Sequence, residues 1–98
     1  MSKKIIFKYD LPLQILDEND ALSVSMPRGA KVLHVAEQTG RLCAWALVDP
    51  AQKAVSPVRF AVHGTGHPFD HSGDYVGTAL LLGGRLVLHV FLLKGAAL

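Results

Sequence analysis

The size and composition of this chain exclude several classes of protein. It has 98 residues, of which half are hydrophobic and 18% are charged, and this balance excludes a disordered chain. The formal net charge of +2 is too small for the concentrated basic face that nucleic-acid recognition usually requires, so we expect no direct nucleic-acid binding. We expect one domain over residues 1–98, with residues 93–98 as a candidate disordered tail.

The first part of the chain has the pattern of short strands separated by turns. Residues 3–9 are rich in strand formers, and residues 11–16 are compatible with a second short extended piece. The "DEND" at 17–20 is typical of a polar turn. In residues 22–26 leucine, valine and methionine alternate with two serines, which predicts a strand with one buried face.

Two hairpins are predicted in the rest of the chain. Residues 32–37 and 42–48 flank a "TG" dipeptide, and residues 75–82 and 85–93 flank a "GG" dipeptide that suits a two-residue turn. With another strand at 58–63, we predict at least five strands and less than about a sixth of the residues in α-helix. The fold class is therefore all-β, a small antiparallel sandwich or a partly open barrel.

The last strand is apolar on both faces. Leu86, Leu88, Val90 and Leu92 form one face, and Val87, His89, Phe91 and Leu93 form the other. We therefore expect a central strand that is covered on both sides. The second cover is either a second copy of the chain, which predicts a homo-oligomer with Leu88, Val90 and Phe91 at the interface, or the ordinary core of a closed barrel.

Cysteine content and the longest apolar stretch bear on location. Cys43 is the only cysteine, so an internal disulfide is excluded, and its apolar neighbours predict a buried thiol without catalytic activation. The start lacks a signal-peptide pattern and the apolar stretch at 75–93 is interrupted by glycines, so we expect a cytoplasmic protein without a membrane span. Trp45 is expected in the core, and His34 and His89 at core or interface positions.

The segment 63–74, "HGTGHPFDHSGD", holds three of the five histidines and is the candidate site. Its glycines and proline exclude a helix. Three interpretations stay open. The three histidines with Asp70 or Asp74 could form a zinc site, backbone N–H groups with Thr65 could bind an anion, or the segment is only a long turn.

From this segment we select binding residues and assign no catalytic residue, no metal ligand and no cofactor. The candidate binding residues are Thr65, Gly66, His67, Asp70 and His71. Phe69 is expected to anchor the loop against the core, and His63 to point inward beside Phe60 and Val62.

Four stretches together resemble a known family: "MPRGAKVLHV", "LCAWALVDP", "RFAVHGTGHPFD" and "YVG…LVLHVF". The family consists of small proteins that are commonly carried by phages and prophages and described only as a domain of unknown function. The resemblance covers roughly Lys4 to Leu92, with the motifs in the same order. It implies no activity, cofactor or catalytic residue, but it implies a binding role, because small accessory phage proteins often act by binding.

These observations lead to one leading expectation and two alternatives. We expect a non-enzymatic accessory protein in the host cytoplasm that inhibits a host immune complex, such as CRISPR–Cas, by stoichiometric binding. The first alternative is an oligomeric sponge that holds a phosphate-bearing nucleotide signal in the "HGTGH" loop. The second is a metal-dependent hydrolase that uses the loop histidines.

Overall fold

The computed structural model describes residues 3–94, and these residues form seven strands and no α-helix. The strands are β1 (Ile5–Asp10), β2 (Ala21–Pro27), β3 (Lys31–Gln38), β4 (Arg41–Val48), β5 (Val55–Gly64), β6 (Asp74–Leu81) and β7 (Leu86–Leu93). Two short 3-10 turns are η1 (Leu13–Ile15) and η2 (Leu82–Gly84). The all-β prediction and the four strands predicted by position are confirmed.

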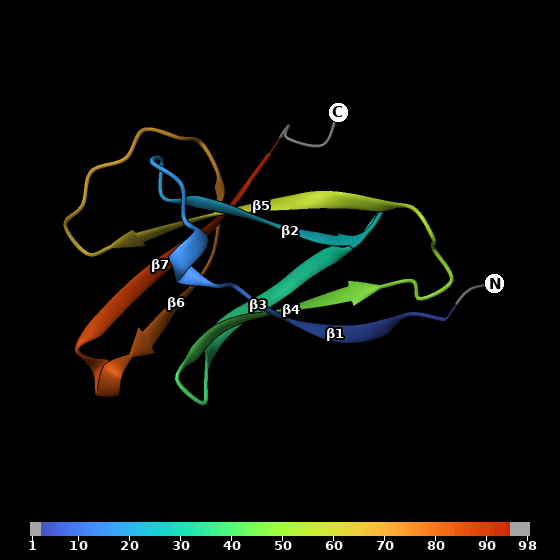
Figure 1. The fold of residues 1–98 in the computed structure, drawn as a ribbon, viewed down its shortest axis with the longest axis horizontal. Helices are drawn as coiled ribbons and strands as arrows, with labels where there is room; N and C mark the ends of the chain where they lie inside the picture. Colours follow the sequence, from blue (N-terminus) through green and yellow to red (C-terminus); the bar gives the residue numbers. More distant parts are fainter. Residues whose placement is uncertain (1–2, 95–98) are drawn as a thin grey trace.

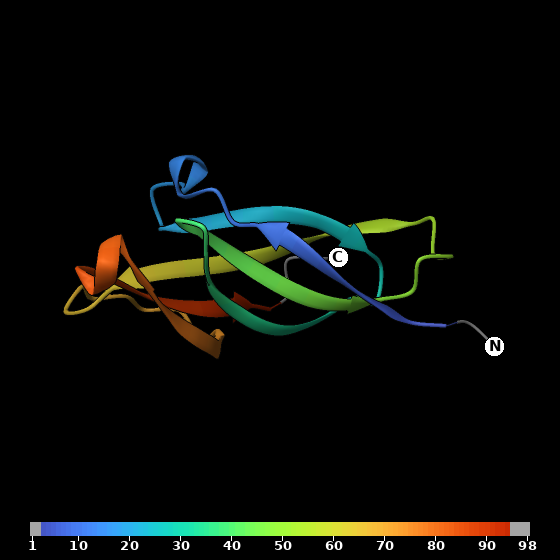
Figure 2. The same cartoon turned by 90° about the horizontal axis from the view of Figure 1, so that it is seen from below.

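The strands form two antiparallel sheets that pack as two layers (Figure 2). The three-stranded sheet has the order β1-β4-β3, and the four-stranded sheet has the order β2-β5-β7-β6. β3 and β6 come close at one edge, where a Cβ at Gly77 would lie 3.0 Å from Val35 Cγ2. The sheets nevertheless keep separate ladders, so the fold is a sandwich that is not closed into a barrel.

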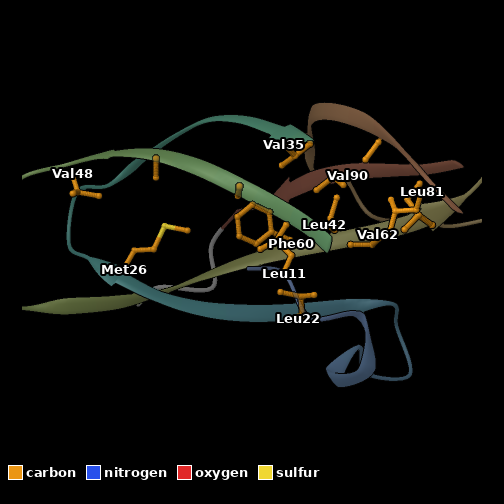
Figure 3. Close-up of a cluster of buried hydrophobic side chains, with 14 residues drawn as sticks. Leu11, Leu22, Met26, Val35, Leu42, Val48, Phe60, Val62, Leu81 and Val90 are labelled. Carbon is orange, nitrogen blue, oxygen red and sulfur yellow. The ribbon is translucent and has the colours of Figure 1, made fainter. Parts of the chain in front are cut away.

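The core lies between the two sheets and follows the alternation of the strands (Figure 3). Phe60 of β5 and Met26 of β2 are fully buried, and Leu42 of β4 and Val90 of β7 meet them from the neighbouring strands. Truncation of a buried phenylalanine to alanine typically costs about 3–5 kcal/mol, so a side chain such as Phe60 stabilises both sheets at once.

Of the two predicted two-residue turns, one is confirmed and one is not. The "TG" hairpin has the expected two-residue turn, with positive φ at Thr39 (50°) and Gly40 (82°). The "GG" turn is longer than predicted, because Leu81 pairs with Leu86 and leaves residues 82–85 outside the ladder. The prediction of a two-residue turn there was wrong, since Leu82 and Arg85 stay outside the ladder together with the two glycines.

Residues 11–16 do not form the extended piece that we predicted. Only Leu11 continues β1, with its N–H donating to Leu42 O at 2.9 Å, and its side chain is buried. Pro12 then begins the 3-10 turn η1. The chain bends here because the next residues must pass from the three-stranded sheet to β2 in the other layer (Figure 1).

His34 and Trp45 lie on the outer face of the three-stranded sheet, which corrects the predicted core position of Trp45 and leaves only the interface alternative for His34. Trp45 is half-buried and His34 is exposed, with their ring centroids 6.2 Å apart. On β4 the small side chains of Ala44 and Ala46 face the core, so alternation directs Trp45 outward. A bulge between Val32 and His34 brings the histidine opposite the tryptophan.

β7 lies between β5 and β6, as expected for a central strand. Leu88 and Val90 are 7% and 0% exposed within the chain's own core, so these two side chains are not available to a second copy. Phe91 on the opposite face is half-buried by the chain itself. The homo-oligomer stays a prediction; a row of exposed apolar side chains that could serve it is on β1, at Ile5–Phe7.

At the end of the chain, Leu93 belongs to β7, and residues 95–98 of the predicted tail lie outside the described residues. Among residues 3–94 there is no helix with the length and apolar character needed to cross a membrane.

Candidate binding site

The loop of residues 65–73 folds back over the outer face of the four-stranded sheet. It leaves β5 and returns as β6 in a wide arc (Figure 1). The Phe69 ring stacks on the His63 ring, with centroids 4.2 Å apart and planes inclined by 3°, and it lies 5.2 Å from the Phe91 ring. Phe69 therefore anchors the loop on the outer face, with 47% of its side chain exposed, and not against the core as we predicted.

His63 also points to this outer face, away from Phe60 and Val62, which corrects its predicted direction. β5 alternates, so Phe60 and Val62 face the core while His63 faces the loop. The loop nevertheless covers His63 so completely that only 3% of it is exposed. His63 and His71 join edge to edge through their Nε2 atoms at 2.7 Å, and Phe69 stacks on both rings.

The hydrogen bonds assign the tautomers of both rings. The Gly73 N–H donates to His71 Nδ1 at 3.1 Å, so that nitrogen carries no proton. A neutral His71 then holds its proton on Nε2 and donates to His63 Nε2. The proton of His63 therefore lies on Nδ1.

That Nδ1–H is buried and has no hydrogen-bond partner within residues 3–94. The Asp20 carboxylate is the nearest acidic group, with Oδ2 at 3.9 Å, beyond hydrogen-bond distance. A buried donor without an acceptor costs about 1–3 kcal/mol. Burial is the main cause that lowers the pKa of His63, and the repulsion between the protonated forms of His63 and His71 adds to it, although Asp20 acts in the opposite direction. His63 is therefore neutral at pH 7.

Gly73 is a site residue that sequence reasoning missed. A Cβ at this position would lie 2.9 Å from Leu92 O and 3.3 Å from His71 Nδ1. Any larger residue would push the loop away from β7 and break the hydrogen bond that Gly73 makes to His71. Glycine is therefore required here for close approach of the backbone.

A second polar network lies on the same face, beside the first one, and it is more open to solvent. Thr65 Oγ1 is 2.8 Å from His89 Nε2, and Thr78 Oγ1 is 2.9 Å from His89 Nδ1. The Tyr75 hydroxyl continues the chain to Thr78. Both hydroxyls can donate or accept, so this network accommodates more than one tautomer of His89.

Two of the five predicted binding residues belong to these networks, one to each, and the other three lie elsewhere on the loop. Thr65 contacts His89, whereas His71 contacts His63. Gly66 has φ of 87°, and His67 closes the turn with its N–H donating to Gly64 O at 3.2 Å. Asp70 is exposed further along the loop. The loop therefore has two ends with different chemistry, which the sequence pattern did not separate.

Asp20, Thr78 and His89 belong to the site although they were not predicted to: His89 contacts Thr65 of the loop, Thr78 contacts His89, and Asp20 lies beside His63. The only signal for Asp20 is the pairing of β2 with β5, which sets Ala21 opposite Ala61 and so brings the 17–20 turn near His63. That pairing joins segments about forty residues apart in sequence and is not visible in local patterns.

A hollow of about 330 Å³, here called the acidic hollow, opens between the 17–21 turn, β5 and the loop. Its charged lining residues are Glu18, Asp20, Arg59 and Asp70, and its aromatic ones are His63, Phe69 and His71. The hollow is at the lower end of the size range of small-ligand sites, about 300–1,000 Å³. Its excess of carboxylates disfavours a phosphate-bearing ligand at this end of the loop.

The 17–21 turn beside the hollow has a defined shape. Backbone N–H groups of Asn19 and Ala21 donate to Asp17 Oδ1 at 2.8 and 3.1 Å. These hydrogen bonds, that of Ala21 first, lower the pKa of the Asp17 carboxyl.

A second hollow of similar volume lies between β1 and the β3–β4 hairpin, but Asp10 there already pairs with Arg41 at 3.0 Å.

Two further chemistries can be compared with the geometry. Within residues 3–94, no three His, Cys, Asp or Glu side chains are placed to share a metal ion. Cys43 is buried, and burial, followed by its contact with Asp10, raises the pKa of the thiol. This position is the one predicted for a thiol that is not activated.

A family model matches residues 2–97, nearly the whole chain, under the description "Domain of unknown function (DUF7352)". The chain belongs to this family. No match was found among curated proteins or among solved structures. Membership in DUF7352 agrees with the resemblance of the sequence to a domain of unknown function, and it does not assign an activity to the protein.

Proposed function

We propose that this DUF7352 protein is a non-enzymatic binding protein whose contact surface is the outer face of the four-stranded sheet. The observation that carries the proposal is a group of exposed apolar side chains on that face. Phe69, Tyr75 and Leu80 are 47%, 60% and 58% exposed. Phe69 and Tyr75 both contact Phe91, and Leu80 lies on the same face beyond Thr78. Exposed apolar side chains gathered on one face with a polar rim are typical of protein interaction sites.

The surface is also held in place before any partner arrives. Phe69 is fixed by its stack on His63, and Tyr75 contacts both Phe91 (5.6 Å between centroids) and Thr78. A contact residue that is already ordered loses less conformational entropy on binding. This order supports a role as a preformed contact surface for a partner.

For the partner we propose a host immune complex such as CRISPR–Cas, which the protein would inhibit by stoichiometric occlusion. The support is the resemblance of the four sequence motifs to phage-borne proteins. The nucleotide sponge is less favoured, because the hollow beside the loop has an excess of carboxylates. The metal-dependent hydrolase is less favoured because His63 and His71 already occupy each other's Nε2 atoms.

Phage plating on hosts with defined defence systems tests this proposal. Strains that carry single CRISPR–Cas systems would express the wild type or one of two surface variants, Leu80→Ser and His67→Ala. Wild type should raise the plating efficiency of a targeted phage and copurify with the effector complex. Both variants should lose these effects and keep the wild-type melting temperature, because both side chains are exposed.

Leu33→Ser and His34→Ala are the matched controls, since both residues are exposed on β3 of the other sheet. They should behave as wild type. A wild type without effect on any of the systems would contradict the proposed partner. Equal losses in the controls and in the surface variants would contradict the proposed face.

A further inference from the structure

The acidic hollow is negatively charged although the chain as a whole carries +2. Three carboxylates line it, those of Glu18, Asp20 and Asp70, against the single guanidinium of Arg59. Arg59 is already paired with Asp17 at 3.4 Å. The lining residues thus have a net charge of −2 when His63 and His71 are neutral, and an unpaired negative hollow attracts a cation.

A second, independent feature of the hollow is a buried polar atom in its wall that has no hydrogen-bond partner among residues 3–94. His63 lines it, is 3% exposed, and directs an unpartnered Nδ1–H towards Asp20 at 3.9 Å. A small rotation of the Asp20 side chain would let one oxygen accept this hydrogen bond. The other oxygen would then remain for a donor that enters the hollow, so a bound donor-bearing group and the buried imidazole would share one carboxylate.

The wall of the hollow selects among cations. Phe69 and His71 contribute ring surfaces, and Phe69 is half exposed. A planar guanidinium can stack on such rings and donate two parallel hydrogen bonds to a carboxylate. An ammonium group can also lie over an aromatic ring, but it is not planar and cannot donate two parallel hydrogen bonds to one carboxylate. A hydrated metal ion matches the carboxylates but not the aromatic wall.

We propose that the acidic hollow binds the guanidinium of an arginine side chain on the partner protein. The identity of the occupant as part of a protein rests on the proposed function. Asp20 is the principal acceptor and also closes onto His63, and Asp70 and Glu18 supply further negative charge. Phe69 is both the anchor of the loop and the surface on which the guanidinium stacks.

The backbone of Asp20 is held in place, so that only its side chain needs to move. Its N–H donates to Asp17 O at 3.0 Å, and its carbonyl accepts from Val62 N–H at 2.9 Å. Its φ is 58°, a left-handed conformation that aspartate and asparagine adopt more readily than other residues with side chains. Asp20→Asn therefore removes the charge and preserves the turn.

An NMR titration of protein labelled with ¹⁵N on backbone and histidines tests the proposal without the partner. The probe is N-acetyl-arginine methylamide, and the control ligand is its citrulline analogue, which has similar shape but no charge. Arginine should shift the His63 ring and the Asp20 amide with a saturable, millimolar dissociation constant that rises with salt. Citrulline should bind at least tenfold more weakly.

The variants separate this site from general attraction of cations. Asp20→Asn should weaken arginine binding at least tenfold, whereas Asp74→Asn should leave it unchanged, since Asp74 pairs with Lys94 outside the hollow. The proposal would be overturned if citrulline bound as tightly as arginine, or if arginine still bound to Asp20→Asn. It would also be overturned if calcium or N-acetyl-lysine methylamide bound in the hollow more tightly than the arginine probe. Lack of any saturable shift would also overturn it.

This result is distinguishable from failure of the proposed function. If the arginine probe does not bind but Leu80→Ser still abolishes inhibition of the host complex, only the arginine site is wrong. If the probe binds in the hollow but no defence system is inhibited, only the proposed partner is wrong.

Discussion

His63 and His89 lie directly opposite each other on β5 and β7, on the same face of the same sheet, yet their surroundings differ. His63 is covered by Phe69 and His71, and its hydrogen bonds assign a single tautomer. His89 lies between two threonine hydroxyls at a more open position. One side of the 65–73 loop therefore builds a buried support, and the other leaves an adaptable polar surface.

The difference shows what the loop does for the fold. The outer face of β7 is apolar, and in this structure the chain covers part of it with its own loop through contacts to Phe91. A central strand thus gains a second cover without another subunit. The residues that make this cover also carry the exposed ring of Phe69, so support and contact surface are coupled in one segment.

The largest expected effect concerns Leu88, the neighbour of His89 on the opposite face of β7. Leu88→Ala should lower the free energy of unfolding by about 2–5 kcal/mol, because it leaves a cavity in the core. Leu80→Ala, on an exposed position of β6, should cost less than about 1 kcal/mol. Urea denaturation of both variants measures the difference, and equal losses would show that the outer face is as buried as the core.

The next effect compares the two histidines directly. His63→Ala should cost about 2–3 kcal/mol, since it removes the stack under Phe69 and leaves the His71 Nε2–H without its acceptor. His89→Ala should cost less than about 1 kcal/mol, because water can replace its contacts to exposed hydroxyls. The same urea measurements decide, and a larger loss for His89 would reverse the roles assigned to the two residues.

Stability should also depend on pH through His63. Its pKa in the folded chain is lowered, so below the unfolded value of about 6.5 the unfolded chain binds more protons than the folded one. This contribution to stability is fully present above pH 6.5 and is lost as the pH falls towards the lowered pKa, by at most about 1.4 kcal/mol per pH unit.

Urea denaturation at several pH values from about 7.5 to about 5, the range in which histidines titrate, measures this slope. His63→Phe should reduce the slope, because the ring remains but no longer titrates. His34→Gln should keep it, since it leaves the His63–His71 pair intact. A slope that survives unchanged in His63→Phe would assign the pH dependence to other groups.

The smallest expected effect is that of His67→Ala. His67 is exposed, and the structure places its ring over Gly64, where a Cβ would meet it at 3.3 Å. The free energy of unfolding should change by no more than about 0.5 kcal/mol. A melting temperature several degrees below wild type would mean that this side chain supports the loop, and its proposed role in contact with the partner would lose its basis.

Local patterns were sufficient for the strands and for part of the site. Alternation in 22–26, the "TG" hairpin and the apolar strand 86–93 correspond to observed elements, because period and turn chemistry act over a few residues. The prediction that Phe69 anchors the loop was partly confirmed, since a large apolar side chain in a polar loop must be covered by something.

Positions that depend on pairing between distant segments were not predictable in this way. His63 was expected to face inward, but direction along β5 is set by its register with β2 and β7. Trp45 was expected in the core because it is large and apolar. Side chains on β4 alternate between the two faces, and this alternation directs Trp45 outward, beside His34.

By itself the sequence determined an all-β chain with a glycine- and histidine-rich loop at the end of β5, since strand propensity, alternation and turn residues are local properties. Only the tertiary structure decided which histidine is buried and which carboxylate faces it. The 17–20 turn and the 65–73 loop meet because β2 and β5 pair side by side, and this contact depends on packing between segments that no local pattern connects.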